Sequence, residues 1–245
     1  MPSPAAAPAR DTWLAGLVAC GLAAEAGVVR AGLSARGLRT RSVPAGAAVS
    51  AWTCAAGGST IAVVVSGRGP AAARRAAAFW APRAATVIVT GAAAATGLVD
   101  APAVLLEGDG SAAAAARAHA TRHGLAVAEG RIATVSAPTL SAAGLASLAA
   151  AGYAAADSEA QPWREAAIAL GIPVLVCRGL LAGEPVPDID LLTPPGRASR
   201  SWWRTVLRLA ARGGVGDRLR RHDQALVGAA RDAGGCAIAT LLGPG

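Results

Sequence analysis

The chain has 245 residues, of which 53% are hydrophobic and 30 are glycine, and its formal net charge is +8. This length fits one α/β domain with a substantial core. Because there is only one Tyr and one Phe, Ala, Val and Leu must fill that core. The positive charge would favour an anionic partner, but a biased Arg-rich and Ala-rich composition is the stronger interpretation of it. The sequence has no nucleic-acid-reading motif and too few aromatic rings for base stacking, so we expect no nucleic-acid partner.

The cysteines and histidines give no sign of a metal centre. No C-x-x-C pair occurs, so neither a zinc ribbon nor a redox pair is indicated, and a reducing cytoplasm fits best. The four cysteines are Cys20, Cys54, Cys177 and Cys236. His119 and His123 stand four residues apart on an expected helix, but the sequence places no third ligand beside them. We therefore expect solvated histidines and no metal.

The N-terminal residues 1–10 contain three prolines and no periodic pattern, and are expected to form a flexible leader. The apolar stretch that follows, residues 13–24, is too short to cross a membrane, and Asp11 offsets the one positive charge that precedes it, Arg10. We therefore do not interpret it as an export signal, and its first part, residues 13–20, is expected to be a buried strand. Gly21 ends this strand before a helix expected over 23–34.

The same order of strand, turn and helix repeats along the chain. Residues 60–65 are a β-branched run, 66–69 form a turn, and Pro70 begins a helix over 71–80. Further strands are predicted at 85–89, 104–107, 131–135 and 173–177, and helices at 111–123, 141–151 and 157–170. This alternation predicts a single α/β domain over residues 11–195, with a mainly parallel or mixed central sheet covered by helices.

The chain changes character after Glu184, where four prolines lead into a basic segment at 197–221. On a helical wheel, the arginines from Arg200 to Arg212 form one stripe, opposite apolar residues around Trp203. The favoured interpretation is that this helix covers the edge of the sheet; the alternative is peripheral contact with an anionic membrane surface. Residues 196–245 are expected to form a C-terminal helical segment packed on or beside the domain.

Sheets of this type bind ligands beyond the carboxyl ends of their strands, so the turns there are the candidate site. The loop containing Ser66 and Gly67 leads into a helix N-terminus, which favours an anion such as phosphate. Glu25 and Glu159 each begin a helix; they are either helix-dipole partners or a carboxylate pair suited to glycosidic chemistry. A dinucleotide site is excluded, since Gly69 is not followed by the third glycine of G-x-G-x-x-G.

Five stretches between residues 13 and 184 resemble the superfamily of nucleoside phosphorylases and methylthioadenosine nucleosidases, and are most similar to its hopanoid-associated phosphorylase group. They are CGLAAEA at 20–26, VVSGRGPAAA at 64–73, VTGAA at 89–93, ADSEA at 156–160 and ALGIPVLVCR at 169–178. The resemblance implies that Glu25 handles the nucleophilic water and that Glu159 binds the ribose hydroxyls. It also implies that Ser66, Gly67 and Arg178 lie near phosphate or water.

The same resemblance implies no cofactor, inorganic phosphate as a co-substrate in phosphorolysis, and a homodimer or larger assembly. It also marks departures from the family. Ala182 stands where the family has the acid that protonates the leaving purine, a step worth about 10²- to 10⁴-fold. Ser158 replaces the methionine of the Asp-Met-Glu signature, and residues 135–138, where a Phe often stacks on the base, read Val-Ser-Ala-Pro.

Two functions follow from these observations. The first is cleavage of the N-glycosidic bond of a purine-type nucleoside, by phosphate or by water, with adenosylhopane as the substrate that the hopanoid-associated group implies. The second is a non-catalytic nucleoside-binding or scaffold protein of the same fold, because Ala182 lacks the acid. In either case we expect a cytoplasmic protein, with peripheral contact at the inner membrane surface as the alternative.

Overall fold

The computed structural model describes residues 13–136, 141–181 and 215–243, with side chains of the last segment described from residue 224. Within these ranges, ten strands form one sheet. The strands are β1 (Gly16–Cys20), β2 (Arg41–Val43), β3 (Ser50–Ala56), β4 (Ser59–Val65), β5 (Val87–Ala95), β6 (Val104–Glu107), β7 (Val127–Glu129), β8 (Arg131–Thr134), β9 (Tyr153–Asp157) and β10 (Val174–Leu181). The helices are α1 (Ala23–Ala35), α2 (Pro70–Trp80), the 3₁₀ helix η1 (Ala81–Arg83), α3 (Gly110–Arg122), α4 (Ala142–Ala150), α5 (Ala160–Ala169) and α8 (Val215–Leu242).

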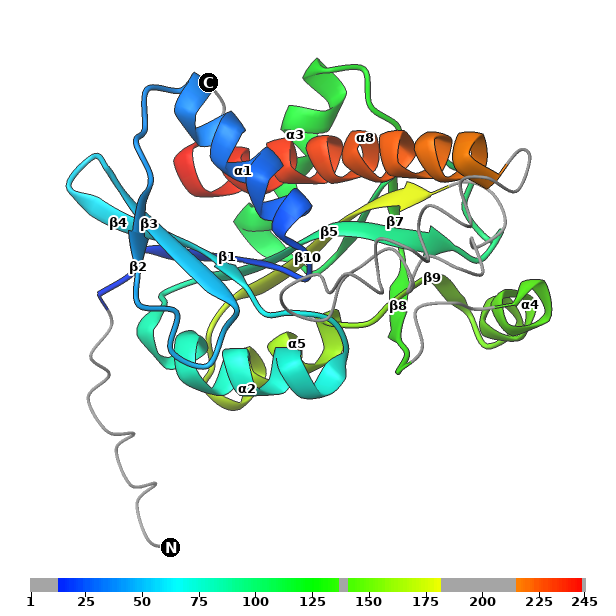
Figure 1. Cartoon of the computed structure of the whole chain (residues 1–245), viewed down its shortest axis with the longest axis horizontal. Coiled ribbons are helices and arrows are strands. Elements are labelled where there is room, and N and C mark those ends of the chain that lie inside the picture. The colour runs from blue at the N-terminus through cyan, green and yellow to red at the C-terminus, as the bar shows by residue number, and fades with distance from the viewer. Residues whose placement is uncertain (1–12, 137–140, 182–214, 244–245) are drawn as a thin grey trace, which may run out of the picture.

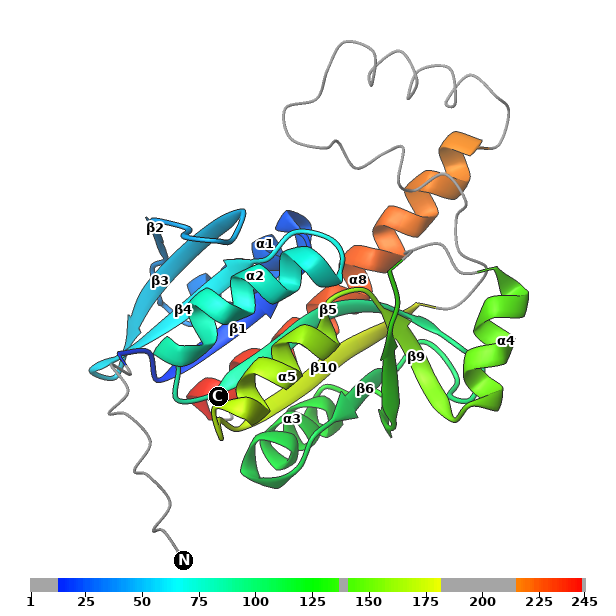
Figure 2. The ribbon, with the colours of Figure 1, turned by 90° about the horizontal axis from the view of Figure 1, so that it is seen from below.

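The sheet is mixed, with the order β2-β3-β4-β1-β5-β10-β6-β7 (Figure 2). Its central strands β4, β1, β5 and β10 are parallel, whereas β2 with β3, β3 with β4, and β6 with β10 are antiparallel. β9 pairs with the last residues of β5, and β8 pairs with β9. Helices α2 and α5 cover one face, while α1, α3 and α8 cover the other (Figure 1). The predicted α/β class, with a helix-covered sheet, is confirmed.

The core consists of aliphatic strands packed against alanine-rich helices. Helix α2 turns Ala73, Ala76 and Ala77 toward the sheet. On the other face α8 lies so close to β10 that a Cβ added at Gly179 would be 2.0 Å from the carbonyl oxygen of Ala229. Small side chains therefore allow the close helix-on-sheet packing that the composition predicted.

Helix α8 crosses one face of the sheet and packs on α1, α3, β5 and β10 (Figure 1). Among the described residues, its segment Gln224–Leu242 is the stretch long and apolar enough to span a membrane, with a mean hydropathy of 1.3. Its buried side chains, which include Ala233, Cys236 and Ala237, face the domain core. The apolar composition of this segment is accounted for by this packing.

Two strands are longer than predicted. β5 was expected over residues 85–89, but it continues to Ala95. β10 was expected to end at Cys177, just before Arg178, but it runs to Leu181 and pairs residue by residue with β5. Gly91 has φ +137° inside a paired strand, so this glycine serves a close approach and not a chain reversal.

Strands β2, β3, β7 and β9 were not predicted, and the helix expected from residue 157 begins at Ala160. β9 has the sequence YAAAD, whose alanines have low strand propensity, so it is the pairing with β5 and β8 that makes it a strand. The expected leader, residues 1–10, lies outside the described residues. So do residues 197–214 of the expected basic segment, whose remaining part belongs to α8.

Candidate active site

The carboxyl ends of the central parallel strands bring the predicted residues together. In register, Cys20 at the end of β1 is opposite Val65 at the end of β4, and Arg178 of β10 is opposite Gly91 of β5. Glu25 follows β1, Ser66 follows β4, and Glu159 follows β9, which is hydrogen-bonded to β5. Segments far apart in the sequence therefore converge at one end of the sheet, where sheets of this type bind ligands.

Glu25 is buried in the first turn of α1 and held by three backbone N–H groups. The amides of Gly21 and Leu22 each donate to its Oε2 at 3.0 Å, and the amide of Ala92 donates to Oε1 at 2.9 Å. A carboxylate offers about four acceptor positions, and these amides occupy three of them. The carboxylate is thereby fixed in orientation between β1 and β5.

Gly91 is the position where β5 passes Glu25 and Arg178. A Cβ at residue 91 would lie 2.3 Å from Oε1 of Glu25 and 2.6 Å from Nη1 of Arg178. Both distances are far below van der Waals contact, and the positive φ further disfavours any side chain. The glycine of the VTGAA stretch is therefore required by the geometry of the two charged side chains.

Arg178 is fully buried, and its guanidinium organises the cluster. Its Nε and Nη2 donate to Oδ2 of Asp157 at 3.1 and 2.5 Å, and Nη1 donates to the carbonyl oxygen of Thr90 at 2.8 Å. Nη2 also lies 3.7 Å from Oε2 of Glu159. Burial lowers the pKa of Arg178, but the charges of Asp157, Glu25 and Glu159 outweigh it and raise the pKa, so the group stays cationic.

Sequence reasoning assigned no role to Asp157, which is the main partner of Arg178. Besides the guanidinium, it accepts hydrogen bonds from Oγ1 of Thr134 at 2.7 Å and from the amide of Ala160, the first residue of α5. It therefore joins β8, β9, α5 and β10. The signal that could have revealed it is the need of a buried arginine for a paired carboxylate.

Glu159 is buried next to this ion pair. Burial raises its pKa, with the charges of Asp157 and Glu25 acting in the same direction and Arg178 and the Ser158 hydroxyl acting against it. Oε1 accepts hydrogen bonds from the amide of Gly69, at 3.3 Å, and from the hydroxyl of Ser158. Oε2 faces Arg178, with its Nη2 at 3.7 Å.

The glycine-rich loop after β4 contacts the cluster through its backbone. The hydroxyl of Ser66 contacts the carbonyl oxygens of Cys20, at 3.2 Å, and Gly67, at 3.0 Å, and so ties the loop to the end of β1. The amide of Gly69, at the N-terminus of α2, donates to Glu159. In this structure a carboxylate of the chain itself takes the anion position that sequence reasoning gave to phosphate.

The buried charged groups of the described residues are three carboxyl groups, of Glu25, Asp157 and Glu159, and one guanidinium, of Arg178. The cluster therefore has an excess of negative charge when its carboxyl groups are ionised. Such a cluster suits a ligand with hydroxyl groups and a developing positive charge. The predicted acid position, Ala182, lies outside the described residues.

Several solved structures share this fold. The 5′-methylthioadenosine/S-adenosylhomocysteine nucleosidase of Helicobacter pylori superposes with a TM-score of 0.69 and 14% identity, covering 94% of this chain and 98% of that one. The corresponding enzyme of Neisseria meningitidis, in complex with methylthio-immucillin-A, gives 0.68 and 19%, covering 93% and 97%. Futalosine hydrolase of Helicobacter pylori gives 0.69 and 13%, covering 94% and 97%.

This chain has the nucleosidase fold. No protein-family model and no curated protein sequence matches it, so the likeness is carried by structure. The resemblance to the superfamily that the sequence motifs predicted is thereby confirmed at the level of the fold. In the nucleosidase fold of this chain, Glu25, Glu159 and Arg178 lie in one buried cluster.

Proposed function

We propose that the chain hydrolyses the N-glycosidic bond of a purine-type nucleoside. The observation that carries the proposal is the convergence of Glu25, Glu159 and Arg178 at the carboxyl ends of β1, β5 and β10. In this proposal Glu25 orients and deprotonates the attacking water through its free acceptor position. Glu159 accepts hydrogen bonds from ribose hydroxyls through Oε2, and Arg178 keeps the carboxylates in place.

The charge of the cluster favours water over phosphate as the nucleophile. A phosphate dianion would meet three carboxyl groups and one guanidinium, and the Gly69 amide that could bind it already donates to Glu159. Water meets no such repulsion. The excess negative charge also stabilises the positive charge that develops on the sugar ring as the glycosidic bond breaks.

We propose adenosylhopane as the substrate, because the sequence resemblance favours it. We also propose a cytoplasmic protein that meets this lipid-linked substrate at the inner membrane surface. As in the family that the motifs resemble, we propose a homodimer or larger assembly. We propose that no cofactor takes part in the hydrolysis: Glu25 accepts a proton from the attacking water, and the leaving base takes its proton from solvent water, because position 182 is alanine.

A second function is supported by one observation, the alanine at position 182. Without an acid to protonate the leaving base, cleavage would be slower by about 10²- to 10⁴-fold. A chain that keeps the buried cluster but lacks the acid would bind a nucleoside without turning it over at a useful rate.

Base release distinguishes the two functions. The purified protein is incubated with adenosine, methylthioadenosine and adenosylhopane, with and without inorganic phosphate, and free base is measured by chromatography. We expect release that does not depend on phosphate. Glu159→Gln should abolish it, whereas Glu165→Gln, which removes an exposed carboxylate on α5, should not.

The variant Ala182→Asp completes the test. Base release that appears only in this variant would establish a binding protein whose crevice is intact. Release by the wild-type chain that requires phosphate would contradict hydrolysis, and equal turnover by Glu159→Gln would contradict the site.

A further inference from the structure

The carboxyl groups of the charged cluster are all engaged by hydrogen-bond donors of the protein. Glu25 accepts from three backbone amides, and Glu159 accepts from one amide and one hydroxyl. Asp157 accepts from an amide, a hydroxyl and the guanidinium of Arg178. Hydrogen bonds of this kind favour the ionised form of a carboxyl group. The cluster is therefore built to accept protons and to hold hydroxyl groups, and it is poorly suited to protonate a leaving base.

Neither Glu159 nor the histidines of α3 take the role of that acid. Burial raises the pKa of Glu159, but the proposed function places this carboxyl group at the ribose, on the sugar side of the glycosidic bond. His119 and His123 lie at the end of α3, and the ring of His119 faces Gly235 of α8. Burial lowers the pKa of His119, and the charges that add to this effect belong to His123 and to two arginines outside the cluster. None of these groups is therefore placed to protonate the base.

The sequence also lacks an acid at the position that supplies it in the family that the motifs resemble. That position is Ala182. A neutral purine departs as an anion unless a proton reaches its imidazole ring, and an acid placed for this step is worth about 10²- to 10⁴-fold. A purine that is alkylated at N7 already carries a positive charge and departs as a neutral molecule. Release of such a base needs no acid, so alanine at position 182 does not slow it.

The charged cluster is acidic, although the chain as a whole is basic. The cluster has three buried carboxyl groups and one guanidinium, whereas the formal net charge of the chain is +8. Besides burial, the charges that shift the pKa of Glu159 are the positive charge of Arg178 and the negative charges of Asp157 and Glu25. Buried charges are screened weakly, so an excess of negative charge there attracts a cationic ligand.

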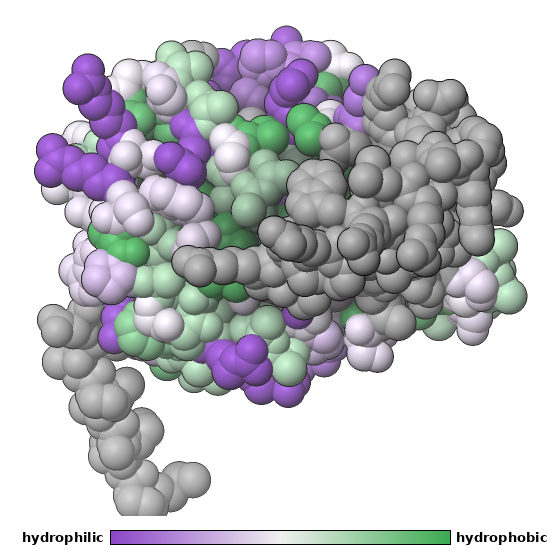
Figure 3. All heavy atoms as spheres, viewed as in Figure 1, coloured by the Kyte–Doolittle hydropathy of each residue, from purple (hydrophilic) through white to green (hydrophobic). Residues whose placement is uncertain are grey.

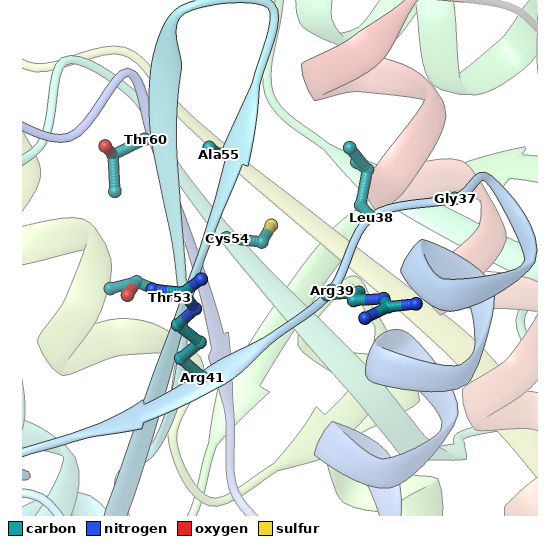
Figure 4. A pocket seen from close by; sticks show the side chains of 8 residues that line it. All are labelled: Gly37, Leu38, Arg39, Arg41, Thr53, Cys54, Ala55 and Thr60. Carbon is teal, nitrogen blue, oxygen red and sulfur yellow. The ribbon is translucent and has the colours of Figure 1, made fainter.

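Arginines at the edge of the sheet lie away from this cluster. Arg39 and Arg41 line a cavity between the segment that follows α1 and strands β3 and β4, and their side chains point in different directions (Figure 4). Thr60, which also lines this cavity, is at the amino end of β4, whereas the cluster is at the carboxyl ends of the central strands. Figure 3 shows hydrophilic side chains gathered over the end of α1 and the hairpins of β2 to β4. The positive charge of Arg39 and Arg41 is therefore separate from the buried carboxyl groups.

We propose that the charged cluster hydrolyses N-glycosides whose base already carries a positive charge, such as N7-alkylated purine nucleosides. This inference rests on the proposed hydrolysis and adds a substrate class to adenosylhopane. Water attacks C1′, the bond from C1′ to N9 breaks, and the electron pair of that bond neutralises the base. One proton of the water passes to Glu25 and then to solvent, so the products are ribose, a neutral 7-alkylpurine and one proton. The positive charge moves from the base to the sugar ring, toward Glu25 and Glu159, which stabilises the transition state more than the bound substrate.

Base release from 7-methylguanosine and from guanosine tests the proposal, because the two nucleosides differ by one methyl group and one charge. The wild-type chain is incubated with each at mildly acidic pH, where 7-methylguanosine is a cation. Free base is measured by chromatography, and release without the protein is subtracted. We expect kcat/KM for 7-methylguanosine to exceed that for guanosine by at least about 10²-fold, because guanosine alone needs the missing acid. A ratio near one would overturn the proposal.

The variant Ala182→Asp links this ratio to the missing acid. An aspartic acid at residue 182 can protonate guanine at N7 but not 7-methylguanine, whose N7 carries the methyl group. We expect the ratio to fall at least about tenfold in this variant, through faster release of guanine. Ala182→Asn is the matched control, since asparagine has the same shape and no acidic proton, and its ratio should stay within about twofold of the wild type. Equal falls in both variants would overturn the proposal.

Binding separates the effect of charge from that of the acid. Titration calorimetry on the Glu25→Gln variant, which is expected to be unable to activate water, compares 7-methylguanosine with the neutral nucleoside 7-methyl-7-deazaguanosine of the same shape. We expect the cation to bind at least about tenfold more tightly, because it meets buried carboxylates, and equal affinities would overturn the proposal. Release of guanine as fast as 7-methylguanine would overturn it and leave the proposed hydrolysis intact. Base release from neither nucleoside would contradict the hydrolysis itself.

Discussion

Glu159 is a residue at which ligand binding and stability are opposed. Its carboxylate is buried, and burial raises its pKa above the ordinary glutamate range, so ionisation of this group disfavours the folded state. The ribose-binding role proposed for it nevertheless requires an ionised acceptor. A neutral glutamine of the same shape removes the charge and keeps an oxygen that can accept from Gly69 and Ser158.

We therefore predict that Glu159→Gln abolishes base release and raises the melting temperature at neutral pH. A raised carboxyl pKa contributes stability below the pKa of the unfolded chain, about 4.3, and that contribution is lost as pH rises through the folded pKa. The gain of the variant should accordingly vanish near pH 4 and grow toward neutrality. In a chain of this size, each kcal/mol shifts the melting temperature by about 2–4 °C.

Thermal unfolding of both proteins from pH 4 to pH 8 measures this difference, with Glu165→Gln as the surface control. A melting temperature of Glu159→Gln that is lower than the wild type at pH 7 would show that the attraction to Arg178 outweighs burial. It would contradict the direction of the pKa shift given above.

Gly91 gives a second prediction at the scale of one residue. Gly91→Ala places a Cβ 2.3 Å from Oε1 of Glu25, so the carboxylate and Arg178 must move apart. A displacement of about 1 Å at reacting groups lowers turnover about 10²-fold, which is the loss we expect in base release. Gly97→Ala is the matched control, because residue 97 also has positive φ, at +97°, but nothing lies within 4 Å of its added Cβ. Similar losses in both variants would assign the effect to backbone strain.

At the scale of elements, the contact between β10 and α8 depends on a glycine in the strand. Gly179→Ala would bring a Cβ within 2.0 Å of the carbonyl oxygen of Ala229, so the helix must move away from the sheet. We predict a loss of about 1–3 kcal/mol in the free energy of unfolding, as for other overpacked cores. Urea unfolding measures it.

Gly228→Ala is the opposite change, one residue from the same contact. An added Cβ at residue 228 meets nothing within 4 Å, and alanine is favoured over glycine inside a helix by about 0.5–1 kcal/mol. Gly228→Ala should therefore stabilise the protein while Gly179→Ala destabilises it. If both variants behave alike, α8 does not pack on β10 as described.

The elements that the sequence predicted are those with strong local signals. The β-branched run of β4, the two loop glycines and Pro70 predicted a strand, a turn and a helix that the structure contains within a residue of the expected bounds. β3 and β9 are rich in alanine and lack such signals, so their formation depends on partners elsewhere in the chain. The full length of β10 could not be predicted for the same reason, because its last residues form a strand by pairing with β5.

The candidate site was predictable only in part for a related reason. Glu25, Glu159 and Arg178 were identified by resemblance to family motifs, and the sheet places them in one buried cluster. Asp157 was quoted within a motif but received no role, because its importance comes from the burial of Arg178, a property of the folded chain. Likewise, the donation of the Gly69 amide to Glu159 joins residues 90 positions apart.

At the scale of the whole molecule, the charged cluster and the hydrophobic core are built on the same strands. The strands β1, β4, β5 and β10, whose carboxyl ends carry the charged cluster together with β9, form the centre of the sheet, and the helices on both faces pack on them. A ligand that binds across these strands must therefore stabilise the entire chain against unfolding, whether or not it is cleaved. The rise in melting temperature caused by a ligand therefore measures binding independently of catalysis.

We predict that methylthioadenosine raises the melting temperature of the Glu25→Gln variant, which keeps Glu159 and is expected to be unable to activate water. At a concentration of about 100 times the Kd, the stabilisation is about 2.7 kcal/mol, equivalent to about 5–10 °C in a chain of this size. Gly91→Ala, with its displaced carboxylates, should show a much smaller shift. A shift in Glu25→Gln with no base release by the wild type would favour the binding protein, because the crevice would then be occupied without chemistry. The absence of a shift with any nucleoside would contradict both proposed functions at once, since each requires a nucleoside to bind the folded chain.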